Sequence, residues 1–311
     1  MAEKAKAGKR ERHEPGAFLD LPPVACEYAS ASAVVLPLPL EESVSYGGGT
    51  AAGPRAIIEA SKQVELYDPR TDAEPALIFG VHTLPAPPCF SGKKKNAVAT
   101  IIDGIAEETA RHLTAGKFVV GLGGEHTVSL GVAMGVARAR GAFTLVHVDA
   151  HADLRDSYED NPLSHACVVR RIAEVPECEA VLQLGIRSTS GDQVEFVRAS
   201  RKPEVRVWYA RDIHRGKEWK REFKKAVHGR RVFFTFDVDG LDPAIMPATG
   251  TPEPDGLTWR QLMSIAKITA KNASECLAMD CVELAPSPGL HHAEFTAARA
   301  VYEMMSLFLG Q

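Results

Sequence analysis

The sequence has 311 residues, of which 45% are hydrophobic and 24% charged, a balance typical of a globular protein with a sizeable core. Its 36 basic and 40 acidic side chains give a net charge of −4, so the general basic footprint of a nucleic-acid-binding protein is absent. No apolar stretch approaches the roughly 20 residues of a membrane span, and the basic N-terminal stretch lacks the apolar segment of a secretory signal. Six cysteines without C-x-x-C spacing indicate reduced thiols and a cytoplasmic protein.

Short β-branched runs alternate along the chain with longer amphipathic stretches. In chain order, strands are predicted over residues 33–38, 118–122, 143–148, 180–185, 205–209, 232–238 and 277–282. Helical patterns cover residues 53–67, 96–113, 127–139, 192–202, 258–272 and 292–309. This alternation predicts an α/β fold with three layers, in which helices cover both faces of a mainly parallel central sheet.

The chain shows no internal repeat and no Pro/Ser-rich linker that would divide it. The prolines of "HTLPAPPCFSG", residues 82–92, indicate a surface loop inside a domain rather than a boundary. The basic stretch near the N-terminus is typical of a disordered tail. We therefore expect a flexible tail over residues 1–15 and a single domain over residues 16–311.

Acidic and histidine residues follow four of the predicted strands, at the point where each strand ends. They are Glu125 and His126, then Asp149, His151 and Asp153, then Asp237 and Asp239, and finally Glu283. In open α/β sheets the ligand crevice lies outside the carboxyl ends of the strands. The four segments are therefore expected to bring these side chains to one edge of the sheet.

The spacing of these residues supports a metal site. In an extended segment, residues two apart point to the same side, so Asp149, His151 and Asp153 share one side, as do Asp237 and Asp239. Together with His126 they supply four carboxylates and two imidazoles, which gives three ligands to each of two divalent ions. This oxygen-rich set favours a hard ion such as Mn²⁺ and argues against a structural Zn²⁺ site.

Simpler interpretations apply to parts of this pattern. A single D-x-D at a strand end is more often a helix cap or a turn, but two such clusters that each follow an apolar strand favour a metal site. His147 has the parity of the ligands yet lies within its strand, so we interpret it as a core or supporting residue. "GLGGEHT" lacks a complete phosphate-binding pattern, and its glycines are expected to allow the turn that directs His126 inward.

Five segments together resemble a known family. "GGEHTVSLG", "HVDAHADLRD", "SHACVVRR", "FTFDVDGLDPAIMPATGTPEPDGLTW" and "DCVELAP" are similar, in the same order, to the motifs of the ureohydrolases, the arginase and agmatinase family. The resemblance covers nearly the whole chain after about residue 30, and it implies an arginase-like fold. It also implies two Mn²⁺ ions per subunit, hydrolysis of a guanidino group to urea and an amine, and assembly into trimers or hexamers.

The resemblance implies a role for each matching residue. His165 corresponds to the histidine that moves protons near the substrate, and Asp153 is a second candidate to protonate the leaving amine. Glu283 corresponds to the carboxylate that faces the guanidinium, and Thr251 to a threonine that contacts substrate. The implied metal ligands are those found from the spacing: His126, Asp149, His151, Asp153, Asp237 and Asp239.

The segment "LRDSYEDNPLSH", residues 154–165, bears on the substrate. Arginases follow their D-A-H-x-D segment with an Asn and then place an S-G-N before the histidine, groups that read an α-carboxylate and an α-amine. Here D-A-H-A-D is followed by Leu154 and Arg155, and no S-G-N precedes His165. The expected substrate is therefore a small cationic guanidino compound without an α-carboxylate and an α-amine, foremost agmatine, which would give putrescine and urea. Guanidinobutyrate, guanidinopropionate, guanidine and arginine are the alternatives, and Glu159 and Asp160 are candidates to attract a distal ammonium.

Two other classes of protein would also use this pattern. A metal-dependent phosphoesterase uses two ions and aspartates, but it needs cationic side chains aimed at phosphate, whereas these strand ends supply mainly acids. A catalytically silent, polyamine-binding relative would keep the fold and lose a metal ligand, and none of the six is lost. Both classes are less favoured than a ureohydrolase.

Overall fold

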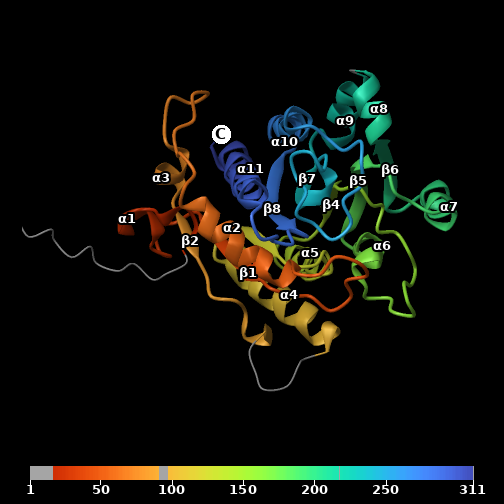
Figure 1. Cartoon of the computed structure of the whole chain (residues 1–311), viewed down its shortest axis with the longest axis horizontal. Coiled ribbons are helices and arrows are strands. Elements are labelled where there is room, and N and C mark those ends of the chain that lie inside the picture. The colour runs from red at the N-terminus through yellow and green to blue at the C-terminus, as the bar shows by residue number, and fades with distance from the viewer. Residues whose placement is uncertain (1–16, 91–96, 217, 311) are drawn as a thin grey trace, which may run out of the picture.

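The apolar runs of the sequence form the strands of one sheet in the computed structural model, which describes residues 17–90, 97–216 and 218–310. The strands are β1 (Ala33–Leu38), β2 (Val81–Thr83), β3 (Phe118–Gly123), β4 (Phe143–Val148), β5 (Cys178–Ile186), β6 (Glu204–Tyr209), β7 (Arg231–Asp237) and β8 (Glu275–Val282). They lie in the order β2-β1-β3-β8-β7-β4-β5-β6 (Figure 1), and each pairing is parallel. Every residue of β3 and β4 is buried, as a parallel sheet covered on both faces requires.

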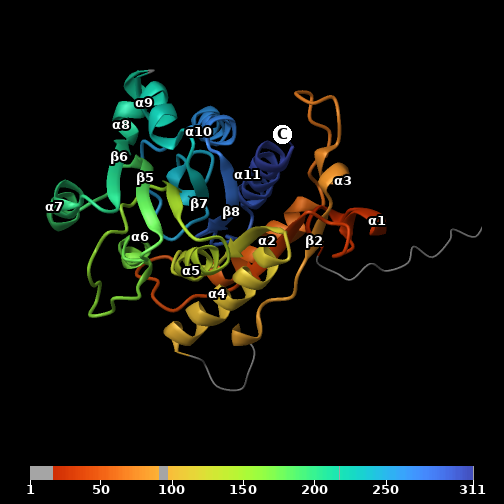
Figure 2. The ribbon, with the colours of Figure 1, turned by 180° about the vertical axis from the view of Figure 1, so that it is seen from behind.

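Helices cover both faces of this sheet. They are α1 (Pro23–Cys26), α2 (Gly53–Ser61), α3 (Pro75–Phe79), α4 (Val98–Thr114), α5 (Val128–Arg140), α6 (Val168–Ala173), α7 (Gly191–Ala199), α8 (Ala210–Arg215), α9 (Glu218–Val227), α10 (Trp259–Asn272) and α11 (His291–Leu309). Short 3₁₀ turns are η1 (Phe18–Asp20), η2 (Thr50–Ala52), η3 (Pro88–Phe90), η4 (His165–Cys167) and η5 (Val238–Gly240). Residues of α4 to α7 join the apolar core on one face, and residues of α2 and of α8 to α11 join the core on the other. Figures 1 and 2 show α10 and α11 across the strands from α4 and α5.

The predicted three-layer α/β fold is confirmed, and the sheet is parallel throughout rather than mainly parallel. The sequence pattern does not predict β2, which lies at the edge of the sheet beside β1. The predicted surface loop 82–92 therefore begins inside a strand. A run of three residues followed by prolines is too short to carry a recognisable strand period.

Several helices differ from the predicted ones. The helix predicted over 53–67 ends at Ser61, whose buried hydroxyl donates to the carbonyl of Ile58 (2.7 Å) and accepts from the N–H of Leu19 (2.7 Å). Helices α1, α3, α6 and α8 span only four to six residues, too few to show a helical period. Helix α9 is missed because charged residues surround its buried Trp219 and Phe223.

The predicted N-terminal tail, residues 1–15, lies outside the described residues. The single domain from residue 16 onward stays a proposal, which the one continuous sheet supports. Within the described ranges, no helix is both long and apolar enough to cross a membrane.

The order of the strands positions the polar clusters. The four strands β3, β8, β7 and β4 are neighbours in the sheet, although β7 and β8 come last in the chain. Because all four are parallel, their carboxyl ends lie at the same edge. The crevice expected where strand order departs from chain order is therefore lined by the residues that follow these strands.

Candidate metal centre and substrate cavity

His126 reaches the edge of the sheet through a turn that only glycine allows. A Cβ atom on Gly124 would lie 2.0 Å from the carbonyl oxygen of Leu40, so this position has no room for a side chain. After the turn, the side chain of His126 is only 1% exposed. The turn after β3 thus directs this imidazole inward, as the sequence predicts.

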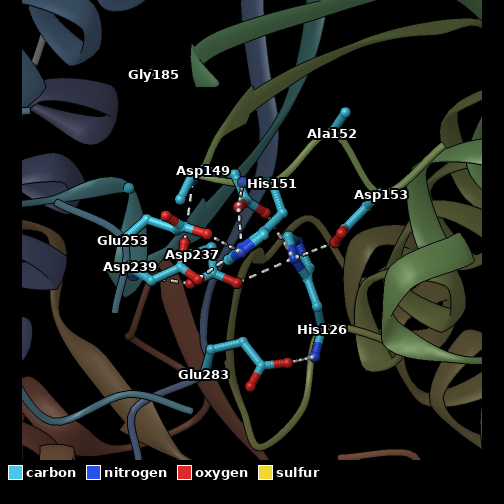
Figure 3. Close-up of polar contacts among 12 residues, drawn as sticks. His126, Asp149, His151, Ala152, Asp153, Gly185, Asp237, Asp239, Glu253 and Glu283 are labelled. Atoms are coloured by element: carbon cyan, nitrogen blue, oxygen red, sulfur yellow. Dashed lines mark hydrogen bonds and ion pairs between the residues drawn. The ribbon is translucent and has the colours of Figure 1, made fainter. Parts of the chain in front are cut away.

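The Nδ1 atom of His126 faces three carboxylates. It lies 3.1 Å from Oδ2 of Asp149, 3.2 Å from Oδ2 of Asp153 and 3.2 Å from Oδ2 of Asp237. None of these contacts has the geometry of a hydrogen bond, so this buried nitrogen has no hydrogen-bond partner. Nε2 lies 3.0 Å from the hydroxyl oxygen of Thr235, to which it donates when Nδ1 carries the lone pair. Figure 3 shows the ring directed at the aspartates.

A second group lies beside the first. Nδ1 of His151 is 2.9 Å from Oδ2 of Asp239 and 3.6 Å from Oδ1 of Asp149. Asp149 thus presents one oxygen to each group, and Figure 3 shows it between the two imidazoles. The ligand atoms of Asp149, His151 and Asp239 lie within 4.8 Å of one another.

The carboxylates of this cluster are buried close together and need compensating positive charge. Burial lowers the pKa of His151, but the carboxylates of Asp239 and Asp149 outweigh it and raise that pKa to about 12. Burial and the charges of Asp239 and Asp149 raise the pKa of Asp237 well above its usual value. Clustered buried carboxylates are stable only when positive charge compensates them. Together with the unpartnered Nδ1 of His126, this donor set fits two hard divalent cations.

His147 supports the cluster from within β4. Its Nε2 donates to Oδ2 of Asp149 (2.8 Å), while its Nδ1 accepts from the side-chain amide of Gln183 (3.0 Å). That amide also donates to the carbonyl of Ala152 (2.7 Å), which fixes its orientation. His147 therefore orients a carboxylate, the kind of contact that commonly surrounds metal ligands.

A cavity of about 290 Å³ opens above the cluster. The predicted residues that line it are His151, Asp153, His165, Asp237, Asp239, Thr251 and Glu283. His126 and Asp149 are buried and contact these lining residues. The structure thus brings the six predicted metal ligands together with His165, Thr251 and Glu283.

Glu283 closes one side of the cavity in a left-handed backbone conformation, with φ of 66°. Its Oε1 accepts the backbone N–H of His126 over 2.6 Å, which ties it to the first group. Burial raises the pKa of Glu283 to about 8. A cation beside this carboxyl group would favour its ionised form.

Several lining residues were not predicted from the sequence, and three of them carry a charge or a phenol group: Arg155, Tyr158 and Glu253. The guanidinium of Arg155 lies over the ring of Tyr158, 5.3 Å from its centre. Their presence in the segment 154–165 is the only signal the sequence offers. Glu159 and Asp160, the candidates for a distal ammonium, are exposed and are not among the residues that line the cavity.

The guanidinium of Arg187 is hydrogen-bonded to the loop that carries Asp239. It donates to the carbonyls of Asp239 (2.7 Å), Leu241 (3.2 Å) and Gly240 (3.3 Å) in and after η5. It also donates to the carbonyl of Glu253 (2.9 Å), whose side chain lines the cavity. One side chain thus holds the metal-site loop against the cavity wall.

Comparisons with known proteins agree with this geometry. The model of the arginase family matches residues 31–307. The N(1)-aminopropylagmatine ureohydrolase of Thermus thermophilus is 38% identical over 280 residues, 90% of this chain and 91% of that protein. The agmatinase of Bacillus anthracis is 33% identical over 286 residues, 91% and 93% of the two chains. The crystal structure of the agmatine ureohydrolase of Thermoplasma volcanium has a TM-score of 0.78 at 26% identity and covers 94% of both chains.

Proposed function

The chain belongs to the arginase family, and on that premise we propose that it is a manganese-dependent ureohydrolase that cleaves the guanidino group of agmatine or of a close guanidino amine. The products would be urea and the corresponding amine. The observation that carries this proposal is the pair of His/Asp groups at the floor of a cavity whose wall holds Glu283.

The donor set would hold two divalent ions. His126, Asp149, Asp153 and Asp237 would serve one ion, and His151 and Asp239 the other, with Asp149 between them. Such ions, when bound, lower the pKa of water so that hydroxide is available near neutral pH.

The protein's own residues bind and orient the substrate. A guanidinium is planar and stays protonated at neutral pH, so a carboxylate such as Glu283 can accept parallel N–H bonds from it. This contact would hold the guanidino carbon over the metal floor of the cavity. The amine must gain a proton as it leaves, and His165 and Asp153, which both line the cavity, are the groups that can deliver it.

Two observations favour a guanidino amine. The segment 154–165 has no Asn directly after D-A-H-A-D and no S-G-N before His165, the groups with which arginases read an α-carboxylate and an α-amine. The relatives described above act on agmatine or, by name, on its N(1)-aminopropyl derivative. The acidic side chains Glu253 and Glu283 on the cavity wall suit a cationic substrate of either length.

A second candidate substrate is a guanidino acid such as guanidinobutyrate. Among the described residues that line the cavity, Arg155 is the only one with a permanent positive charge. An arginine at this place can pair with a carboxylate at the far end of the substrate. This single observation keeps the guanidino acids as the alternative.

Urea release from a panel of compounds tests the proposal. The panel holds agmatine, N(1)-aminopropylagmatine, guanidinobutyrate, guanidinopropionate, guanidine and arginine, each with Mn²⁺ and after chelation. We expect the highest kcat/KM with one of the two agmatine compounds and none after chelation. Arginine as the best substrate would contradict the reading of residues 154–165, and no urea from any compound would favour the silent, polyamine-binding alternative.

Assembly is proposed on the same premise. A trimer or hexamer of the 33.6 kDa chain is expected in solution. Light scattering coupled to size exclusion measures the mass directly, and the mass of a single chain would contradict the proposal.

A further inference from the structure

A buried carboxylate, a hydroxyl and an imidazole form a hydrogen-bonded chain beside the cavity. Glu125, which is fully buried, accepts the backbone N–H groups of Glu42 and Ser43 at its Oε2, each over 2.7 Å. Its Oε1 lies 3.1 Å from the hydroxyl oxygen of Ser43. That hydroxyl in turn lies 3.1 Å from Nδ1 of His165 and accepts the backbone N–H of His165 over 3.0 Å.

The number of hydrogen bonds that the Ser43 hydroxyl can donate and accept sets the direction of these bonds. A serine hydroxyl has one proton and two lone pairs. Since a carboxylate oxygen can only accept, the contact between Ser43 and Glu125 uses the proton of Ser43. Both lone pairs then accept from His165, one from its backbone N–H and one from Nδ1–H. The neutral ring of His165 therefore carries its proton on Nδ1, and its Nε2 is left with a free lone pair.

A second hydroxyl competes for the same nitrogen. The Oγ atom of Ser164 lies 3.4 Å from Nδ1 of His165, farther than that of Ser43. If Ser164 donated its proton to Nδ1, the neutral ring would carry its proton on Nε2 instead. The two serines thus predict opposite tautomers, and substitution can separate them.

We infer that Glu125 and Ser43 are positioning residues that fix the tautomer and the orientation of His165, so that Nε2 serves the cavity as proton acceptor and donor. This inference rests on the proposed role of His165 in proton transfer. In the neutral state Nε2 takes up a proton from the water that hydrolysis consumes, and in the cationic state it passes that proton to the leaving amine. Nδ1 keeps its bond to Ser43 throughout, with the Glu125 carboxylate behind it to stabilise the cationic ring.

Glu125→Gln tests the direction of the chain. The glutamine oxygen can keep both backbone N–H bonds to Glu42 and Ser43, so its amide group must face the Ser43 hydroxyl as a donor. The hydroxyl then turns its own proton towards Nδ1 of His165 and reverses the tautomer. We expect kcat to fall about tenfold to 100-fold, within the loss for His165→Asn, while KM changes little. A kcat close to that of the wild type would overturn the inference.

Ser43→Ala removes the hydrogen bond between the Ser43 hydroxyl and Nδ1 of His165 instead of reversing its direction. The variant keeps both backbone bonds to Glu125, so the loop is expected to stay in place. We expect a fall in kcat of about tenfold or more, and recovery in Ser43→Thr, which restores the hydroxyl. The matched control is Ser164→Ala, for which we expect a kcat close to the wild-type value. A larger loss in Ser164→Ala than in Ser43→Ala would assign the tautomer to Ser164 and overturn the inference.

A double-mutant cycle separates positioning from simple stabilisation of the loop. If Ser43 acts through His165, Ser43→Ala has no further effect in a His165→Asn background. An equal loss of kcat in both backgrounds would show that Ser43 acts elsewhere. Circular dichroism and the melting temperature of each variant confirm that the chain is folded.

One measurement does not depend on turnover. In ¹⁵N-histidine-labelled full-length protein at pH 8, with Mg²⁺ in place of paramagnetic Mn²⁺, His165→Asn identifies the ring signals by their loss. We expect the Nδ1–H tautomer in the wild type and the Nε2–H tautomer in Glu125→Gln. The Nε2–H form in the wild type would refute the inference even if urea is released, and absence of urea release with the Nδ1–H form would refute the proposed function alone.

Discussion

The guanidinium of Arg187 donates to the main-chain carbonyl of Asp239 over 2.7 Å, although the two residues follow different strands. The side-chain carboxylate of the same Asp239 lies 2.9 Å from Nδ1 of His151. Arg187 thus contacts the main chain of Asp239 rather than its carboxylate. It fixes the backbone from which this predicted metal ligand projects.

Substitution of Arg187 by lysine is expected to weaken metal binding and leave the fold intact. Lysine keeps the charge but replaces five donors in a planar fork by three at one point, so it cannot hold the loop after η5 and the carbonyl of Glu253 together. Loss of such supporting contacts typically costs about 10- to 100-fold in metal affinity. Titration of metal-free protein with Mn²⁺, followed by calorimetry, measures the change.

The exposed Arg211 offers a matched control, since its side chain is 68% exposed. Arg211→Lys is expected to bind Mn²⁺ as the wild type does. Equal Mn²⁺ affinities in the wild type and Arg187→Lys would show that the loop after η5 does not depend on these hydrogen bonds.

Asp237→Asn is expected to abolish activity while raising the stability of the metal-free protein near pH 7. Burial and the carboxylates of Asp239 and Asp149 raise the pKa of Asp237, so its charged form opposes folding when no cation is bound. This penalty is present above the raised folded pKa and disappears as the pH falls below the unfolded value. Asparagine removes the charge and keeps the shape.

Urea release measures the loss of activity, and the melting temperature, followed against Mn²⁺ concentration, measures the change in stability. The wild type should gain stability with Mn²⁺, by about 2.7 kcal/mol at 100 times Kd, and Asp237→Asn should gain much less. Asp149→Asn is likewise expected to be inactive and folded. Full activity in thoroughly chelated wild-type protein would contradict the metal assignment altogether.

Arg155→Met is expected to separate the two candidate substrate classes. If the guanidinium of Arg155 pairs with a distal carboxylate, its loss leaves that carboxylate unpaired at a cost of roughly 1 to 3 kcal/mol. The kcat/KM for guanidinobutyrate should then fall about tenfold to over 100-fold, and that for agmatine should stay the same or rise. Arg155→Lys keeps the charge and serves as control. A parallel loss with both substrates would mean that Arg155 supports the cavity rather than reading the substrate.

Glu41→Gln is expected to lower stability at neutral pH and to have little effect in acid. The carboxylate of Glu41 accepts the N–H groups of Ala51 (2.9 Å) and Gly49 (3.0 Å), and these bonds lower its pKa below 4.5 despite opposing burial. Its contribution is therefore present above the unfolded pKa and is lost as the pH falls through the lower folded pKa. Urea unfolding at pH 7 and at pH 3.5 gives the two differences.

A control for this pH dependence is Glu218→Gln. The carboxylate of Glu218 is 79% exposed and, among the described residues, pairs with Arg221 alone. Exposed pairs of this kind contribute little, so a small change is expected at both pH values. A larger effect of Glu41→Gln at pH 3.5 than at pH 7 would contradict the assignment.

Sequence reasoning reached the central sheet because its strands are buried on both faces. Such strands have unbroken apolar sequences, as over residues 143–148, and each is followed by charged residues. Since residues two apart in an extended segment point to the same side, the spacing assigns these charged residues to one side of the chain. The convergence of Asp149 and Asp237 followed from parallel strands alone, since these ends share an edge whatever the exact order. The metal-ligand roles themselves stay predictions.

The residues that sequence reasoning missed act through contacts with no local pattern. Glu125 was placed at the sheet edge from the sequence, but its partner Ser43 lies 82 positions away and was missed, because only the close approach of Gly124 to Leu40 brings their segments together in space. Arg187 recognises main-chain carbonyls, which every residue has, so its partners leave no trace in the sequence. The short strand β2 escapes for a related reason, because tertiary packing rather than its own period defines it. Helix α9 does carry a helical period, with Trp219, Phe223 and Val227 on its buried face, and it was missed because charged residues surround them.

The placement of β7 and β8 between β3 and β4 has a consequence for how the chain acquires its fold. Strands β3 and β4 follow each other in synthesis, yet their facing edges meet no partner until residues 231–282 are made. Until then the nascent chain presents two unpaired, apolar strand edges, the kind of surface that pairs with other chains. Chaperone protection should therefore matter most from the synthesis of β4 until β7 and β8 have been made, and the proposed metal site is complete only after these two strands have paired between β3 and β4.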